Sequence, residues 1–196
     1  MEYMKDAIEA ILDNIRDAED YLVEEDVATF IDIITSCENI FVTGAGRSGL
    51  AAKAFAMRLM HLGLSSYVVG ETISPAINAD DCILAISGSG ETNTIVTAAK
   101  ISKNRGAKVL ALTSYPESTL GQLADCVILV KGRTKVEADD ENYLKRQIKG
   151  NYTSLTPLGT AFELTSLVFL DGMVSELMNA MGKTEADLKL RHTVLE

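Results

Sequence analysis

Hydroxyl side chains and glycines are concentrated in one short run of this chain. The run Ser-Gly-Ser-Gly-Glu-Thr spans residues 87–92, between an apolar stretch and a helical pattern. Glycines let the backbone approach an anion closely, and the start of a helix adds unpaired N–H groups at the positive end of its dipole. Ser87, Ser89 and Thr92 add hydroxyl donors. Because no lysine follows at the spacing of a nucleotide-binding P-loop, the run predicts a site for a single phosphate monoester.

A second glycine-rich turn, Gly-Ala-Gly-Arg-Ser-Gly, lies at residues 44–49 and also follows an apolar stretch. Its glycines have the GxGxxG spacing of a dinucleotide-binding turn, and Glu71 stands where such a fold needs an acid for the ribose. The hydroxyl-rich run at 87–92 has no role in that scheme. We therefore favour a sugar phosphate over a dinucleotide as the ligand.

The same turn supplies three candidate phosphate-binding residues. Gly46 allows close backbone approach, and Arg47 is the nearest cation to either turn. Ser48 brings a hydroxyl to the start of the next helical pattern, where it could also act as the N-cap. A solvated arginine and a simple helix cap are the ordinary alternatives, and the sequence leaves both open.

Five short, mostly apolar stretches alternate with helical patterns through the middle of the chain. The expected strands are 39–43, 66–69, 82–87, 107–113 and 126–131, and the helices between them are 48–62, 91–104 and 118–125. This rhythm predicts an α/β fold with a five-stranded parallel sheet flanked by helices. Ligands of such sheets bind beyond the carboxyl ends of the strands, where the strand order reverses, and both glycine-rich turns follow strands.

The chain is expected to form one domain over residues 1–196. Its parts are N-terminal helices at 1–36, the sheet core at 37–131, a charged excursion at 132–156 and C-terminal helices at 157–196. Helical patterns predict helices over 4–22, 27–36 and 157–181, the last of them long and apolar, and Thr184 with Asp187 predicts a capped short helix near the end. The apolar surface of these helices exceeds what one small sheet covers, which favours self-association.

Composition excludes several classes of function. Lys plus Arg number 18 against 28 for Asp plus Glu, a net charge of -10, so no electrostatic footprint for nucleic acid or an anionic membrane is present. No apolar run approaches the roughly 20 residues of a membrane span, and no signal peptide is evident. The scattered Cys37, Cys82 and Cys126 indicate buried thiols in a reducing cytoplasm. Histidines and cysteines lack metal-ligand spacing, so no metal site is expected.

The paired turns resemble those of the sugar isomerase (SIS) domain family. The segments FAMRLMHLG at 55–63, YVVGET at 67–72, ISGSGET at 86–92 and PLGTAFE at 157–163 resemble its 6-phospho-3-hexuloisomerases. The resemblance implies a cofactor-independent homotetramer that interconverts D-arabino-3-hexulose 6-phosphate and D-fructose 6-phosphate through a cis-enediol. The alternatives are another sugar-phosphate isomerase, or a non-catalytic sugar-phosphate sensor, for which no DNA-binding output segment is evident.

The resemblance also assigns the acid–base residues. Glu163 is implied as the base; it stands near the start of a long apolar helix, where stabilisation by the helix dipole is the alternative. Glu91 is the competing acid, but it is expected to serve the terminus of the helix that follows the hydroxyl-rich run. His61 and His192 are the only histidines, and either is a candidate proton shuttle. In related isomerases a neighbouring subunit can supply the histidine, which makes His192 a candidate in trans.

Overall fold

A single parallel sheet forms the centre of the molecule. The computed structural model describes residues 1–132 and 159–192, so the expected charged excursion lies, apart from Gly132, outside the described residues. The strands are β1 (Ile40–Gly44), β2 (Ser66–Val68), β3 (Cys82–Ile86), β4 (Lys108–Thr113) and β5 (Cys126–Leu129). Their order is β2-β1-β3-β4-β5, and every neighbouring pair is parallel. The predicted five-stranded parallel sheet is confirmed.

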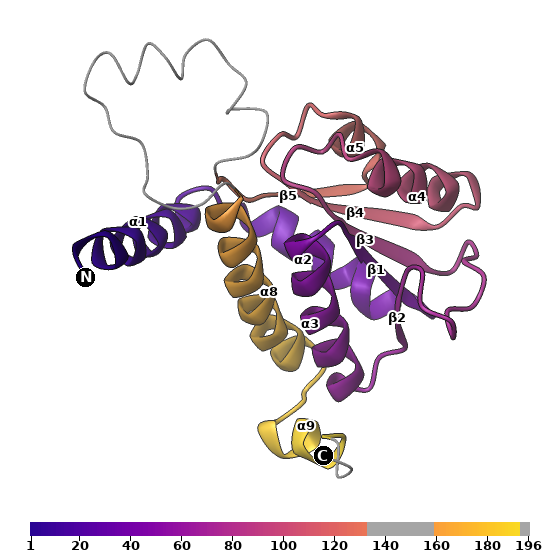
Figure 1. Cartoon of the computed structure of the whole chain (residues 1–196). Coiled ribbons are helices and arrows are strands. Elements are labelled where there is room, and N and C mark those ends of the chain that lie inside the picture. Colours follow the sequence, from indigo (N-terminus) through magenta and orange to yellow (C-terminus); the bar gives the residue numbers. More distant parts are fainter. Residues whose placement is uncertain (133–158, 193–196) are drawn as a thin grey trace.

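Helices cover both faces of this sheet (Figure 1). They are α1 (Glu2–Glu19), α2 (Glu24–Ser36), α3 (Arg47–Leu62), α4 (Asn93–Asn104), α5 (Thr119–Leu123), α8 (Thr160–Ala180) and α9 (Glu185–Leu190). Alternate strand residues enter opposite cores because successive side chains of a strand point to opposite faces. Val42 and Leu84 pack with α2, α3 and α8, whereas Phe41 and Ile83 pack with α4 and α5. The strands are therefore buried on both sides, as their apolar sequences predict.

Several helix starts differ from the sequence-based expectation, among them those of α4 and α8. The helix expected from residue 91 begins at Asn93, because Thr92 has extended backbone angles and forms the N-cap. The helix expected from residue 157 begins at Thr160, directly after Gly159, whose φ of 85° is left-handed. The predicted Thr184–Asp187 capping box at the start of α9 is confirmed.

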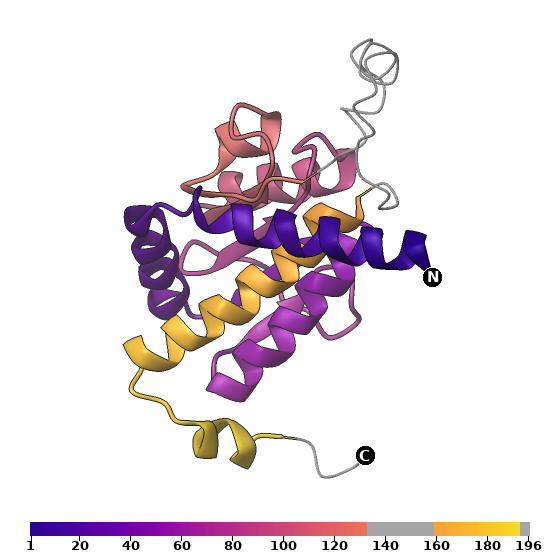
Figure 2. The same ribbon diagram turned by 90° about the vertical axis from the view of Figure 1, so that its left-hand side faces the viewer.

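Helices α3 and α8 lie side by side and run in the same direction (Figures 1 and 2). An ion pair between Arg58 Nε and Asp171 Oδ1, 3.8 Å apart, links their middle turns. Their first turns therefore meet near the carboxyl ends of the strands. Their last turns meet at the opposite side of the molecule, next to α9.

Helix α1 crosses α8 and extends beyond the body of the molecule (Figure 2). None of its residues is buried, and its apolar side chains Met4, Ile8 and Leu12 are exposed. Polar contacts attach it: Asn14 Nδ2 donates to Thr165 Oγ1 at 2.8 Å and to the Lys131 carbonyl oxygen at 3.1 Å. Within the chain, α1 thus contributes little to the apolar core.

The three cysteines are unpaired thiols, as predicted, with Cys82 and Cys126 buried and Cys37 half-buried. Burial, reinforced by the nearby Asp26 and Asp125, raises the pKa of Cys126 to about 11. Cys126 therefore behaves as a small apolar side chain at neutral pH.

Candidate active site

The two glycine-rich turns lie next to each other at the point where the strand order reverses. β1 and β3 are neighbours, with Gly44 opposite Ile86, so the turns at 44–49 and 87–92 leave the same edge of the sheet. From β1 the chain continues to β2 on one side, and from β3 to β4 on the other. Open α/β sheets bind ligands in the crevice at such a position.

The turn at 87–92 presents several hydrogen-bond donors. Ser87 Oγ lies 3.0 Å from Thr92 Oγ1, and Ser89 Oγ accepts from the Glu91 N–H at 3.2 Å. Within the described part of the chain, the backbone N–H groups of Gly88, Ser89 and Thr92 donate no hydrogen bond. With the first turn of α4, they form a set of donors suited to a phosphate group. We call residues 87–92 the phosphate loop.

The turn at 44–49 owes its glycine spacing to packing. A Cβ on Gly44 would lie 2.6 Å from the Ser48 carbonyl carbon, and one on Gly49 would lie 2.6 Å from the Gly44 carbonyl oxygen. Gly46 is the N-cap of α3 with a φ of 59°. The alternative role of Ser48 as the N-cap is wrong, because the chain turns two residues earlier and Ser48 lies buried inside the helix. The GxGxxG spacing therefore needs no nucleotide to explain it.

Besides the Arg58–Asp171 pair, two further ion pairs join α3 to its neighbours. Arg47 Nε donates to Glu163 Oε2, and the Glu163 side chain is only 17% exposed. Arg47 thus contacts the candidate base, a pairing that the sequence did not predict. Lys53 Nζ lies 2.6 Å from Glu71 Oε1, and this hydrogen bond and charge lower the pKa of Glu71. The acid considered for a ribose is therefore engaged by a lysine of α3.

Glu91 serves a different helix from the one expected. Its Oε1 accepts from the Thr119 N–H at 2.6 Å and its Oε2 accepts from Thr119 Oγ1 at 2.8 Å. Thr119 is the first residue of α5, not of α4. The expectation is wrong because α4 begins two residues after Glu91, which leaves that side chain in the loop and within reach of α5. These hydrogen bonds lower the pKa of Glu91.

The two histidines stack on each other at the far end of α3. Their ring centroids are 5.3 Å apart and their planes differ by 26°. Burial, followed by the charges of His192 and Arg58, lowers the pKa of His61. His61 follows Arg47 by 14 residues, which is roughly 21 Å at the rise of an α-helix. A single chain therefore brings Arg47 and Glu163 together beside the turn at 44–49 and leaves both histidines distant.

Across residues 1–132 and 159–192, no cluster of three or more His, Cys, Asp or Glu side chains is arranged to hold a metal ion. In the same part of the chain, no helix combines the length and apolar character required to cross a bilayer.

Comparison with known proteins identifies the family. The family model of the SIS domain matches residues 33–155. The chain belongs to the SIS domain family. It is 46% identical to an uncharacterized protein of Archaeoglobus fulgidus, over 96% of this chain and 98% of that relative. It is 38% identical to the 3-hexulose-6-phosphate isomerase of Bacillus subtilis, over 95% of each chain.

A solved structure agrees with these matches. A Methanococcus jannaschii protein, whose inferred molecular function is 3-hexulose-6-phosphate isomerase, aligns with a TM-score of 0.80 at 33% identity, covering 96% of this chain and 98% of that one. The SIS fold predicted from the paired turns is therefore confirmed. The relatives group this SIS chain with the sugar-phosphate isomerases.

Proposed function

We propose that this SIS chain is an isomerase that interconverts D-arabino-3-hexulose 6-phosphate and D-fructose 6-phosphate. The observation that carries the proposal is the position of a donor-rich phosphate loop and a partly buried carboxylate, Glu163, near the strand-order reversal of one sheet. The relative that is 38% identical is a 3-hexulose-6-phosphate isomerase, and the solved structure that is 33% identical has the same function inferred for it. Both support the same substrate.

The reaction moves a carbonyl group from C3 to C2. A base removes the proton from C2, a cis-enediol forms, and a proton returns at C3 while another moves from O2 to O3. We assign Glu163 as the base. Arg47, which donates to Glu163 Oε2, orients the carboxylate. Anchoring the phosphate on Ser87, Ser89 and Thr92 fixes the reacting carbons relative to that base.

The phosphate also keeps the 3-ketose open. Closing a five-membered ring at C3 requires the C6 oxygen, and phosphorylation blocks that oxygen. The enzyme therefore needs no ring-opening acid in the direction of fructose 6-phosphate. A site with few acid–base groups among the described residues agrees with this simpler chemistry.

We assign the proton transfer between O2 and O3 to His61 or His192 of a neighbouring subunit. Within one chain these rings lie roughly 21 Å along α3 from Arg47, too far to reach the phosphate loop. An assembly that places the end of α3 from one subunit against the phosphate loop of another would complete the site. A homotetramer is the assembly that we propose.

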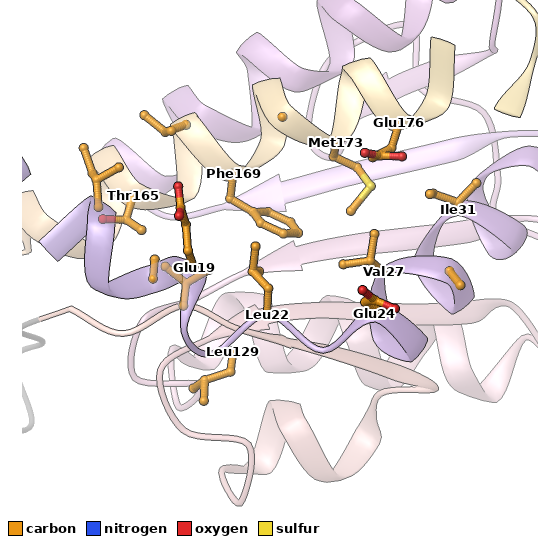
Figure 3. Close-up of a pocket in the computed structure, with 16 residues that line it drawn as sticks. Glu19, Leu22, Glu24, Val27, Ile31, Leu129, Thr165, Phe169, Met173 and Glu176 are labelled. Carbon is orange, nitrogen blue, oxygen red and sulfur yellow. The ribbon is translucent and has the colours of Figure 1, made fainter. Parts of the chain in front are cut away.

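Uncovered apolar surface supports self-association. A groove of about 650 Å³ lies between α1, α2, β5 and α8. Figure 3 shows Leu22, Val27 and Phe169 among the side chains that line it, with Glu19 and Glu176 at its margins. Together with the exposed apolar face of α1, this groove offers a surface for a second copy of the chain.

The experiment is to incubate the purified protein with D-fructose 6-phosphate and to measure the 3-ketose formed. Conversion supports the isomerase. Binding without conversion supports a sugar-phosphate sensor instead, and conversion of only another sugar phosphate from a panel supports a different isomerase. Analytical ultracentrifugation of the same sample tests the homotetramer, which a monomer at micromolar concentration would contradict.

A further inference from the structure

We propose that Glu91 is a positioning residue that holds the phosphate loop in shape by anchoring it to the start of α5. The proposal rests on the proposed function in one respect, that the phosphate loop binds the phosphate of the substrate. It concerns an acidic residue inside that loop, where a carboxylate directed toward the ligand would repel a phosphate.

Two successive loop residues are bound to two successive residues of α5. Both carboxylate oxygens of Glu91 accept hydrogen bonds from Thr119, at 2.6 Å from its N–H and 2.8 Å from its hydroxyl. The Gly90 carbonyl oxygen accepts from the Leu120 N–H at 3.0 Å. N–H groups in the first turn of a helix lack intrahelical acceptors, so a carboxylate and a carbonyl are favourable partners there.

The backbone of Gly90 fits closely against the same part of α5. Its φ of 65° is left-handed, and a Cβ at this position would lie 1.9 Å from Ser118 Oγ. The Gly90 N–H donates to the Ser87 carbonyl oxygen at 3.0 Å, which closes the turn. At its other end the loop is held to the sheet, because the Ser87 N–H donates to the Leu112 carbonyl oxygen at 3.0 Å. Glu91 therefore belongs to the second of two attachment points.

The hydrogen bonds also direct the negative charge away from the ligand. Both oxygens of Glu91 face donors of Thr119, and these donors lower the pKa of the carboxyl. Glu91 therefore stays ionised at neutral pH, and both of its oxygens accept hydrogen bonds from α5. This arrangement differs from that of Glu163, for which Arg47 donates to one oxygen. Glu91 thus has a structural partner for each oxygen and acts on the substrate through the loop.

The test compares Glu91→Ala with Glu91→Gln. The glutamine keeps an oxygen for the Thr119 N–H, and its amide can donate to Thr119 Oγ1, so the anchor survives without the charge. The alanine loses both hydrogen bonds. We expect Glu91→Ala to raise the KM for fructose 6-phosphate and the Kd for inorganic phosphate roughly tenfold, with kcat within about twofold. Glu91→Gln should stay within about threefold of the unaltered protein in all three.

Glu117→Ala is the matched control. This exposed carboxylate precedes α5 and makes no side-chain hydrogen bond with a described residue. If Glu91→Ala changes KM and Kd no more than Glu117→Ala, the proposal is wrong. If both Glu91 variants lower kcat by roughly 10²-fold or more, Glu91 takes part in proton transfer and the proposal is again wrong.

Thr119 provides an independent pair should Glu91→Ala fail to fold. Thr119→Val removes the hydroxyl and should raise the phosphate Kd roughly threefold, whereas Thr119→Ser keeps the hydroxyl and should not. Equal effects of the two variants would contradict the anchor.

Inorganic phosphate binding separates the two proposals, because it requires no isomerase activity. A protein that binds phosphate through the anchored loop but isomerises nothing overturns the proposed function alone, and one that binds no phosphate overturns both.

Discussion

The two ends of the α3–α8 pair carry different chemistry. At their starts, Arg47 contacts Glu163 beside a glycine-rich turn, next to a loop of backbone and hydroxyl donors. At the far end, His61 is buried against His192 and has a lowered pKa. One end combines free backbone and hydroxyl donors with an ion-paired carboxylate. The other holds two stacked imidazole rings, yet within one chain it has no access to the first end.

The comparison teaches that one helix can hold candidate catalytic groups at two separate places. A helix is rigid over its length, so α3 fixes the separation of Arg47 and His61 at roughly 21 Å. Neither rotamer changes nor loop movements close such a distance. Either the histidines are structural, or they act in the site of another subunit. The predictions below test this division, beginning with the largest expected effect.

The first prediction concerns the carboxylate at the start of α8. Glu163→Gln should lower kcat roughly 10²- to 10⁴-fold, because a positioned base is lost, with little change in the Kd for inorganic phosphate. Asp171→Asn, on an exposed carboxylate of the same helix, should have little effect. Turnover near that of the unaltered protein in Glu163→Gln would remove this residue from catalysis.

The second prediction tests whether the far end serves another subunit. Of His61→Asn and His192→Asn, at least one should lower kcat roughly 10²-fold. Refolding that variant together with Glu163→Gln should restore activity, because mixed oligomers contain sites with both native groups. Each variant refolded alone is the control. If both histidine variants keep normal turnover, His61 and His192 stabilise the fold and take no part in catalysis.

The third prediction concerns the phosphate loop. Ser89→Ala should raise the Kd for fructose 6-phosphate roughly tenfold, the effect of losing a hydrogen bond to a charged group, and leave kcat nearly unchanged. Isothermal titration calorimetry measures the Kd. Ser36→Ala, at the exposed end of α2, is the control. An unchanged affinity would exclude Ser89 from the phosphate site.

The smallest effect is expected from pH. The pKa of His61 is lowered in the folded state, so between that value and about 6.5 the unfolded chain binds more protons than the folded one. The free energy of unfolding should therefore fall as the pH decreases below about 6.5. Urea unfolding of His61→Asn should show a weaker dependence over the same range. Equal slopes would show that another group causes the loss of stability.

Local patterns in the sequence predicted the sheet and placed the run at 87–92 directly after one of its strands. Apolar strands, glycine-rich turns and helix periods are properties of neighbouring residues, so they can be read without knowledge of the packing. The partners of the charged side chains could not be predicted in this way. Arg47 and Glu163 are 116 residues apart, and Glu91 and Thr119 are 28 apart. Their contacts depend on the direction in which α8 packs along α3 and on how α5 approaches the loop.

The histidines show the same limit. The sequence indicated that His61 ends a helix and that His192 lies in a polar tail, and both placements agree with the structure. It did not indicate that α9 returns to the end of α3 and stacks the two rings. That contact depends on how α9 docks on α3. Periodicity along one segment carries no information on such docking.

The exposure of helix α1 predicts how fast its amide protons exchange with solvent. Because none of its residues is buried in the chain, its amide hydrogen bonds can open without disturbing the sheet. In a dissociated subunit, the amide protons of α1 should therefore exchange far faster than those of β3, whose five residues are all buried. If subunits associate through α1, its protection rises with protein concentration while that of β3 stays constant. Exchange rates along this one helix thus report on assembly residue by residue.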